Sequence, residues 1–141
     1  MPRNNDYFKA RALEEIQRVK RYPSFVSLVS LDLSHISSRD EIENFENLGK
    51  FYKALRDLVA QSVRETDLIS DVYDGKLSIL LLETPREGAR ALSGRLKKSI
   101  RYFLCNNTRS PINWRVPSRE NCYPGQHNDE HSFLLAINEI S

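Results

Sequence analysis

The first apolar repeat in the chain predicts a helix over residues 5 to 21. Its apolar side chains recur at helical spacing, at Tyr7 or Phe8, Leu13, Ile16 and Val19. The helix is expected to end at Tyr22-Pro23, because the residue before a proline is pushed out of the helical region. Since its apolar surface is thin, residues 1–22 are predicted to be a linker helix or an oligomer contact.

A strand and a long amphipathic segment follow. Phe25–Leu33 is rich in β-branched and large apolar residues, which favours a strand that is buried on both faces. From Asp40 to Val63 the apolar residues again fall three or four apart. That spacing predicts one long helix, or two helices with a break near Gly49.

The next segment has the pattern of a β-hairpin. Two short apolar runs, Leu68–Val72 and Leu77–Leu82, flank the turn-prone Tyr73-Asp74-Gly75-Lys76. Asp-Gly between two β-prone runs is a strong hairpin signal, because both residues tolerate a positive φ. We therefore predict a hairpin with a charged tip, and we treat that tip as a candidate functional site.

The last third of the chain predicts two more helices and one strand. Thr84-Pro85-Arg86-Glu87 has the pattern of a helix start, with Thr84 as N-cap, and the helix should run to about Phe103. A loop over residues 106–111 is followed by a short alternating strand, 112–116, and by a polar, irregular stretch, 117–129. Residues 131–140 suit a helix or a strand, and the helix is favoured.

This order of elements predicts the fold class. Helix, strand, helix, hairpin, helix, strand and helix are typical of an α/β (α+β) protein with a ferredoxin-like, split βαβ core. We expect a single, mostly antiparallel sheet covered by helices. Residues 23–141 are predicted to form one domain, since the chain of 141 residues is long enough for one buried core.

Composition and residue spacing argue against several kinds of partner and site. A net charge of +2 argues against a nucleic-acid partner, although a local basic patch is compatible with it. Cys105 and Cys122 lack metal-ligand spacing and favour a reducing compartment. His35, His127 and His131 share no spacing with acids or cysteines that suggests a metal or nucleophile site. Without a signal peptide or an apolar run of roughly 20 residues, we expect a cytoplasmic module with no membrane segment.

Several segments together resemble a GGDEF domain, the diguanylate cyclase domain that joins two GTP molecules into cyclic di-GMP. They are Leu28 to His35 (LVSLDLSH), the helix end Arg64-Glu65-Thr66-Asp67, the hairpin, and Ile79 to Thr84 followed by Glu87-Gly88-Ala89-Arg90-Ala91. The resemblance covers roughly residues 14–140. It implies a nucleotide-cyclase-like fold and a role in bacterial signal transduction.

The sequence departs from the family at the positions that carry catalysis. The family signature falls on Tyr73-Asp74-Gly75-Lys76-Leu77, so Tyr73 and Asp74 replace the two glycines that let backbone approach the nucleotide. Lys76 replaces a metal-binding carboxylate, and an ammonium cannot ligate a hard cation. Asp32 matches the family's other metal-binding aspartate. We therefore predict no diguanylate cyclase activity, no bound Mg²⁺ and no other cofactor.

Two further family positions also differ. The residues that read guanine in the family fall on Asp40 and Gly49, which puts recognition of the GTP base in doubt. In addition, the segment that closes the family's domain, a helix followed by a final strand, is cut short at Ser141.

A second site of the family, used for product inhibition, is retained in pattern. Arg64 and Asp67 form its Arg-x-x-Asp motif, and register places a third member at Arg95. The resemblance therefore implies a cyclic di-GMP receptor built on Arg64, Asp67 and Arg95. Neighbouring basic residues would add a positive field for an anionic ligand: Arg90, Lys97, Lys98 and Arg101.

Two alternatives stay open. The chain could be a protein-interaction or dimerisation module of a larger signalling protein that binds no nucleotide. It could also be a residual cyclase, in which Asp32 and either Glu83 or Asp74 assemble an altered metal site.

Overall fold

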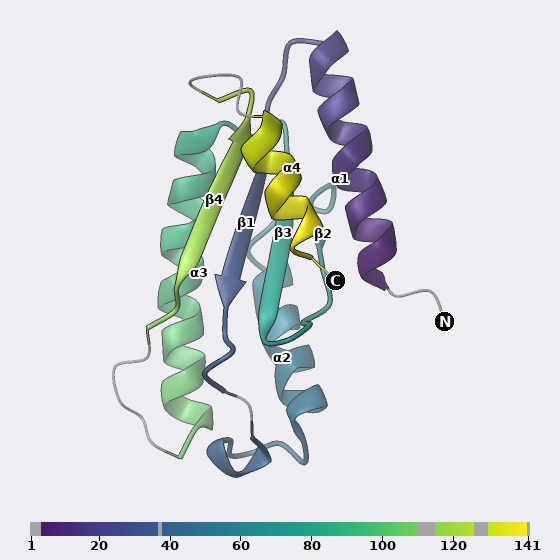
Figure 1. Ribbon diagram of the computed structural model, residues 1–141. Helices are drawn as coiled ribbons and strands as arrows, with labels where there is room; N and C mark the ends of the chain where they lie inside the picture. The colour runs from purple at the N-terminus through teal and green to yellow at the C-terminus, as the bar shows by residue number, and fades with distance from the viewer. Residues whose placement is uncertain (1–3, 37, 110–114, 126–129, 141) are drawn as a thin grey trace.

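The computed structural model describes residues 4–36, 38–109, 115–125 and 130–140 (Figure 1). In chain order the elements are α1 Asn4–Arg21, β1 Val26–Asp32, the 3₁₀ turn η1 Arg39–Glu41, α2 Leu48–Ala60, β2 Leu68–Ile69, β3 Lys76–Leu82, α3 Arg86–Asn107, β4 Ser118–Tyr123 and α4 Glu130–Asn138.

The strands form one sheet in the order β2-β3-β1-β4, and each neighbouring pair is antiparallel. β1 and β3 are the central pair, with Asp32 opposite Lys76 at one end and Val26 opposite Leu82 at the other. This mixed α+β architecture, with one antiparallel sheet covered by helices, confirms the predicted fold class.

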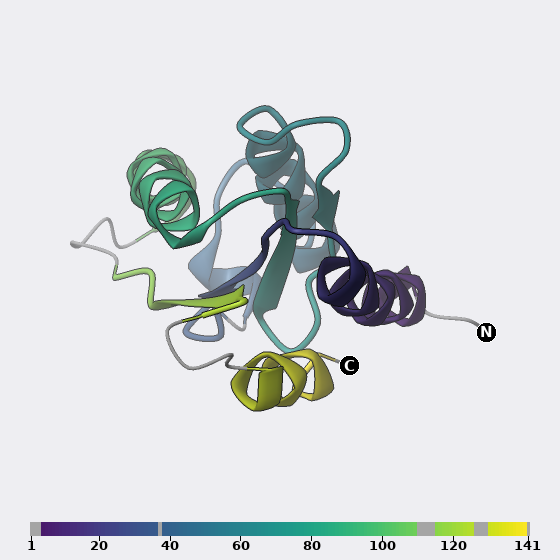
Figure 2. The same ribbon diagram turned by 90° about the horizontal axis from the view of Figure 1, so that it is seen from above.

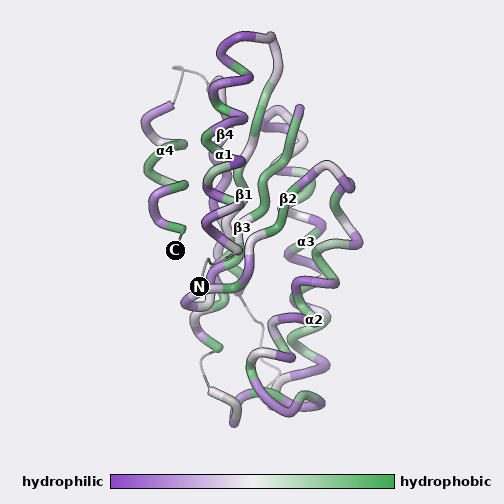
Figure 3. The backbone as a smooth tube through the Cα atoms, turned by 90° about the vertical axis from the view of Figure 1, so that its right-hand side faces the viewer, coloured by the Kyte–Doolittle hydropathy of each residue, from purple (hydrophilic) through white to green (hydrophobic). Residues whose placement is uncertain are grey.

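Helices cover both faces of the sheet. α2 and α3 lie over one face, and α1 and α4 lie over the other (Figure 2). The central strands β1 and β3 form the hydrophobic centre between these layers (Figure 3). Because side chains alternate along a strand, Val29 and Leu31 of β1 face α2 and α3, whereas Val26 and Leu28 face α1 and α4. Burial on both faces explains why β1 carries apolar residues toward each side of the sheet instead of alternating strictly between apolar and polar residues.

α1 is packed against the sheet. Its inward face contributes four buried residues to the core that it shares with α4: Phe8, Ala12, Ile16 and Val19. Its first turn is also fixed by hydrogen bonds, because the buried Asn5 side chain accepts from the Asp71 amide at 2.8 Å and donates to the Asp71 carbonyl at 3.3 Å. The role of residues 1–22 as a linker stays a prediction, but the helix itself completes one face of the core.

The predicted helix over residues 40–63 is wrong in its first third. Residues 40–47 contain the end of the η1 turn and an extended bridge between Ile42 and Thr108 instead of a helix. Asn44 in this segment has a φ of 71°, which a right-handed helix does not allow. α2 begins at Leu48 because the Asn47 side chain accepts a hydrogen bond from the Lys50 amide, as an N-cap does. The alternative of a break near Gly49 was therefore closer to the structure.

The C-terminal predictions need three corrections. The last strand, β4, occupies Ser118–Tyr123 in the stretch predicted to be irregular. Of the strand predicted at 112–116, residues 112–114 lie outside the described part and residues 115 and 116 are not in a strand. α3 begins after Pro85, without a side-chain cap from Thr84, and continues to Asn107. The favoured helix at the C-terminus is confirmed as α4.

The hairpin is confirmed, although β2 is shorter than predicted. Asp74 and Gly75 both have positive φ, 51° and 73°, which suits the tight turn that joins twisted strands. A Cβ atom on Gly75 would lie 2.4 Å from the Cα of Ser34, so this position has room only for glycine.

We predict that Ile16→Ala lowers the free energy of unfolding by about 2–5 kcal/mol, because it leaves a cavity between α1 and the sheet. Leu13→Ala on the exposed side of the same helix should cost less than about 1 kcal/mol. Urea unfolding followed by circular dichroism measures both. Equal, small losses would mean that α1 does not contribute to the stability of the domain.

Candidate functional site

The Arg-x-x-Asp motif forms a tight turn between α2 and β2. The Asp67 amide donates to the Arg64 carbonyl at 3.0 Å, which closes the turn. The Asp67 side chain is only 3% exposed, and its carboxylate accepts from the amides of Arg64 at 3.0 Å and of Leu82 at 3.1 Å. This carboxylate therefore joins the turn to the end of β3.

The Arg64 side chain lies over this turn and is 56% exposed. Its Nη2 donates to the Thr84 hydroxyl at 2.6 Å and to the Leu82 carbonyl, and its Nε lies 3.4 Å from the Asp67 carboxylate. These contacts hold one edge of the guanidinium group against the end of β3. The exposed remainder is a fixed, planar hydrogen-bond donor, the group that proteins use to bind phosphate or guanine edges.

The three predicted ligand residues meet at one depression of about 210 Å³. It lies between the α2–β2 turn and the first half of α3, and it is lined by Ser62, Val63, Arg64, Asp67, Leu81, Thr84, Gly88, Leu92 and Arg95. Gly88 helps to shape it, since a Cβ atom at that position would lie 2.9 Å from the Thr84 methyl carbon. Arg64 and Arg95, from elements far apart in the sequence, thus border the same space.

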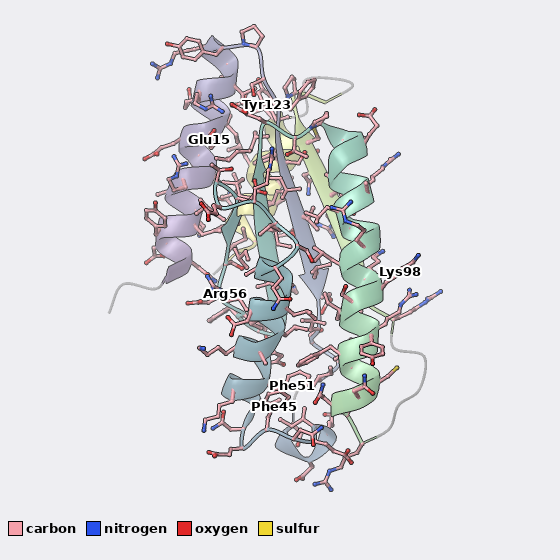
Figure 4. All side chains as sticks on the ribbon, turned by 180° about the vertical axis from the view of Figure 1, so that it is seen from behind. Glu15, Phe45, Phe51, Arg56, Lys98 and Tyr123 are labelled. Carbon is pink, nitrogen blue, oxygen red and sulfur yellow. The ribbon has the colours of Figure 1, made fainter. Side chains whose placement is uncertain are left out.

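α3 gives this region a positive field. Its basic residues are Arg86, Arg90, Arg95, Lys97, Lys98 and Arg101, and its single acid is Glu87. Among the residues that the structure describes, none of these cations forms an ion pair. Lys98 projects from α3 away from the sheet (Figure 4). Unpaired cations on an exposed helix attract anionic ligands, and most strongly at low salt.

The hairpin tip lies at the opposite end of the β1–β3 pair. Lys76 stands across from Asp32, and the backbones of Tyr73 and Lys76 are hydrogen bonded at 2.9 and 3.0 Å. Lys76 also borders a depression of about 170 Å³ with Asp32, Arg119 and Glu139, and in this depression Arg119 and Glu139 form an ion pair at 3.3 Å. The strand register therefore places the Lys76 cation directly opposite Asp32.

The Asp32 carboxylate is already hydrogen bonded within the chain. Oδ1 accepts from the Ser34 amide at 2.9 Å and from the Ser34 hydroxyl at 2.6 Å. These bonds, followed by the charges of Lys76 and His35, lower the pKa of Asp32 below its ordinary value. A lowered pKa means that ionised Asp32 stabilises the fold above the unfolded-state pKa, and that this contribution is lost as the pH falls through the folded-state pKa.

The proposed pairing of Asp32 with Glu83 is wrong. Glu83 follows β3 at the Leu82 end, seven residues beyond Lys76, so roughly 20 Å of strand separates it from Asp32. Glu83 instead lies 3.9 Å from Arg18 of α1. Within the described ranges, no group of three or more His, Cys, Asp or Glu side chains is arranged to hold a metal ion.

The remaining predicted positions are scattered. Asp40 lies in η1 and Gly49 in the first turn of α2. His35 and His131 are exposed, at the end of β1 and in α4, and His127 lies outside the described residues. Among the described residues, Asp40, Gly49, His35 and His131 do not line the depression at the Arg-x-x-Asp turn.

The sequence interpretation missed a larger groove on the other side of Arg64. Its volume is about 500 Å³, and it is lined by Tyr7, Phe8, Arg56, Ala60, Val63, Arg64, Glu65, Asp67, Leu68 and Ile69. Arg56 forms part of its wall (Figure 4) and donates to the carbonyls of Ile69 at 3.0 Å and Ser70 at 3.1 Å. No sequence signal could reveal this groove, because it forms only where residues of α1, α2 and β2 come together in the folded chain.

No helix in the part of the chain that the structure describes is both long and apolar enough to cross a membrane.

The sequence was compared with protein families and with curated proteins. No protein-family model matches the chain. It is 26% identical over 138 residues to a Bacillus subtilis (strain 168) protein named "Uncharacterized membrane protein YdaK", and the match covers 97% of this chain. The chain spans about half the length of that relative, 47%.

Solved structures extend the comparison. A DGC protein from Thermotoga maritima superposes with a TM-score of 0.63 at 14% identity, over 97% of this chain and 94% of that one. The active GGEEF domain of a diguanylate cyclase from Vibrio cholerae superposes with a TM-score of 0.60 at 16% identity, over 92% and 81% of the two chains. The chain therefore has the fold of GGDEF and diguanylate cyclase domains.

Proposed function

We propose that this domain is a catalytically inactive GGDEF-like module that binds cyclic di-GMP at Arg64 and Arg95 and acts as a receptor or regulator. The observation that carries the proposal is that both arginines border one depression, where the exposed Arg64 guanidinium is held in a fixed orientation.

The chemistry of the ligand matches these groups. Cyclic di-GMP carries two phosphodiester charges and two guanine edges with acceptors at O6 and N7. An arginine can bind either kind of acceptor with two parallel hydrogen bonds. The basic residues of α3 favour an anion over a neutral ligand at this face of the domain.

Asp67 has a positioning role in this proposal. Its buried carboxylate accepts two backbone amides and also contacts Arg64, so it keeps both the turn and the guanidinium in place. A carboxylate has lone pairs for more than these bonds, and it could accept from a guanine N–H as the resemblance implies. Substitutions at Asp67 would mix both roles, so the arginines give the cleaner test.

The inactive part of the proposal depends on Lys76. Two-metal phosphoryl transfer needs carboxylates around the ions, and here an ammonium stands across from Asp32. Ser34 already occupies Asp32 Oδ1.

We predict that the full chain binds cyclic di-GMP with a dissociation constant in the micromolar range or tighter. Arg64→Ala and Arg95→Ala should each weaken binding by about 10- to 100-fold, because each removes hydrogen bonds to a charged ligand. Isothermal titration calorimetry measures the change.

Arg21→Ala is the matched control, because Arg21 is an exposed arginine at the end of α1 and should leave affinity unchanged. Equal heats for wild type and Arg64→Ala would refute the assignment of the site. If neither cyclic di-GMP nor GTP gives heat, the protein-interaction alternative is favoured, and its oligomeric state should be measured by light scattering.

Asp67→Ala should lower the free energy of unfolding by about 1–3 kcal/mol, since it leaves the amides of Arg64 and Leu82 without their partner. Arg64→Ala, whose side chain is half exposed, should cost less. Urea denaturation of the ligand-free proteins provides the comparison. A larger loss for Arg64→Ala than for Asp67→Ala would contradict the positioning role of Asp67.

We predict that incubation with GTP and either Mg²⁺ or Mn²⁺ yields no cyclic di-GMP. Lys76→Glu should also give none, because Tyr73 and Asp74 still occupy the positions of the family's glycines. Chromatography of the reaction mixture detects the product. Product from the wild type would disprove inactivity while leaving the proposed binding site untouched.

A further inference from the structure

The depression on the α3 side and the groove on the α1 side share a wall. Val63, Arg64 and Asp67 line both spaces. Arg64 is the exposed member of this wall, whereas Asp67 is buried behind it. A ligand held by the Arg64 guanidinium can therefore extend to either side of that side chain.

The depression alone is small for the proposed ligand. Its volume of about 210 Å³ lies below the roughly 300–1,000 Å³ that is usual for small-molecule sites. The groove, at about 500 Å³, lies within that range. Contacts limited to Arg64, Arg95 and the depression would leave much of a cyclic dinucleotide in solvent.

We propose that cyclic di-GMP bound at Arg64 and Arg95 continues over the Arg64 guanidinium into the groove, where one of its guanines stacks on Tyr7 of α1. This inference rests on the proposed function and deepens it, because it adds a ligand contact from the N-terminal helix to a site otherwise formed by the α2–β2 turn and α3.

The groove has the chemistry that a guanine with a neighbouring phosphate requires. Tyr7 is 63% exposed although it lines the groove, so its ring is accessible for stacking on a planar base. Ala60, Val63, Leu68 and Ile69 add apolar side chains to the lining.

Arg64 is the cation at the groove that can hold a phosphate group. Its side chain is 56% exposed, while the Asp67 carboxylate behind it is buried and hydrogen bonded. Glu65 is the exposed acid of the lining. The Arg56 guanidinium is occupied by the carbonyls of Ile69 and Ser70 and lies 3.6 Å from the Asp71 carboxylate, so its charge is already paired within the chain.

Such a contact would connect the ligand to α1. The first turn of α1 is already fixed to the hairpin by the Asn5 and Asp71 hydrogen bonds, two residues before Tyr7. A base stacked on Tyr7 would add a second point of attachment at the same end of the helix. Bound ligand should therefore hold α1 more firmly on the sheet.

The test compares two exposed tyrosines associated with one helix. Tyr7→Ala should weaken binding of cyclic di-GMP by about 5- to 150-fold, the effect of losing one base–aromatic stack. Tyr7→Phe should bind like wild type, because the ring is kept. Tyr22→Ala is the matched control, since Tyr22 is 61% exposed just after the other end of α1.

The outcomes separate the two proposals. Unchanged affinity in Tyr7→Ala together with loss in Arg64→Ala overturns the stacking inference and leaves the proposed function standing. Absence of binding in the wild type overturns both. An equal loss of affinity in Tyr7→Ala and Tyr22→Ala would mean that both substitutions act by perturbing α1 as a whole, and this result would also overturn the inference.

Hydrogen exchange of the wild-type protein gives a readout that needs no variant. Cyclic di-GMP should slow exchange of the amides in the first half of α1 relative to those near Arg21. Slowing confined to α3 and the α2–β2 turn would overturn the inference, because the ligand would then not reach the groove.

Discussion

The antiparallel pairing of β1 with β3 is the interaction on which the rest of this domain depends. The two strands are paired along their full lengths and, apart from the Asp32–Lys76 end, are largely buried on both faces. α2 and α3 pack on one face and α1 and α4 on the other, so each helical layer has its apolar surface covered by the same pair of strands. Removing either strand would expose both cores at once.

The register of this pair also separates two regions of different chemistry. Asp32 and Lys76 lie at one end, and the Leu82 end carries Arg64 and Asp67 through hydrogen bonds from the neighbouring turn. The length of β3 lies between them. A change at the hairpin tip, such as a lysine in place of a carboxylate, therefore need not disturb the Arg64 site. In the proposed function, this separation is the physical reason why loss of catalysis at the tip is compatible with ligand binding at Arg64.

α1 has more influence than its thin apolar surface suggests. It covers one face of the central pair, its Asn5 side chain binds the backbone ahead of the hairpin, and Tyr7 borders the groove beside Arg64. The same helix thus contacts the core, the hairpin and the proposed ligand site. In the proposed function, α1 is the element through which ligand binding and other parts of a longer protein could affect one another.

The sequence by itself determined the element types, the fold class and the hairpin turn, because apolar periodicity and an Asp-Gly pair are local signals. It missed the extended segment before α2 and the position of β4, since both depend on long-range partners: the bridge from Ile42 to Thr108 and the pairing of β4 with β1. The start of α2 at Leu48 has a local signal, the Asn47 N-cap, which the continuing apolar spacing concealed. Only the tertiary structure decided that Glu83 lies far from Asp32, that the Asp67 carboxylate is buried, and that a groove opens beside Tyr7. Each of these follows from strand register or helix packing, which residues close in sequence do not encode.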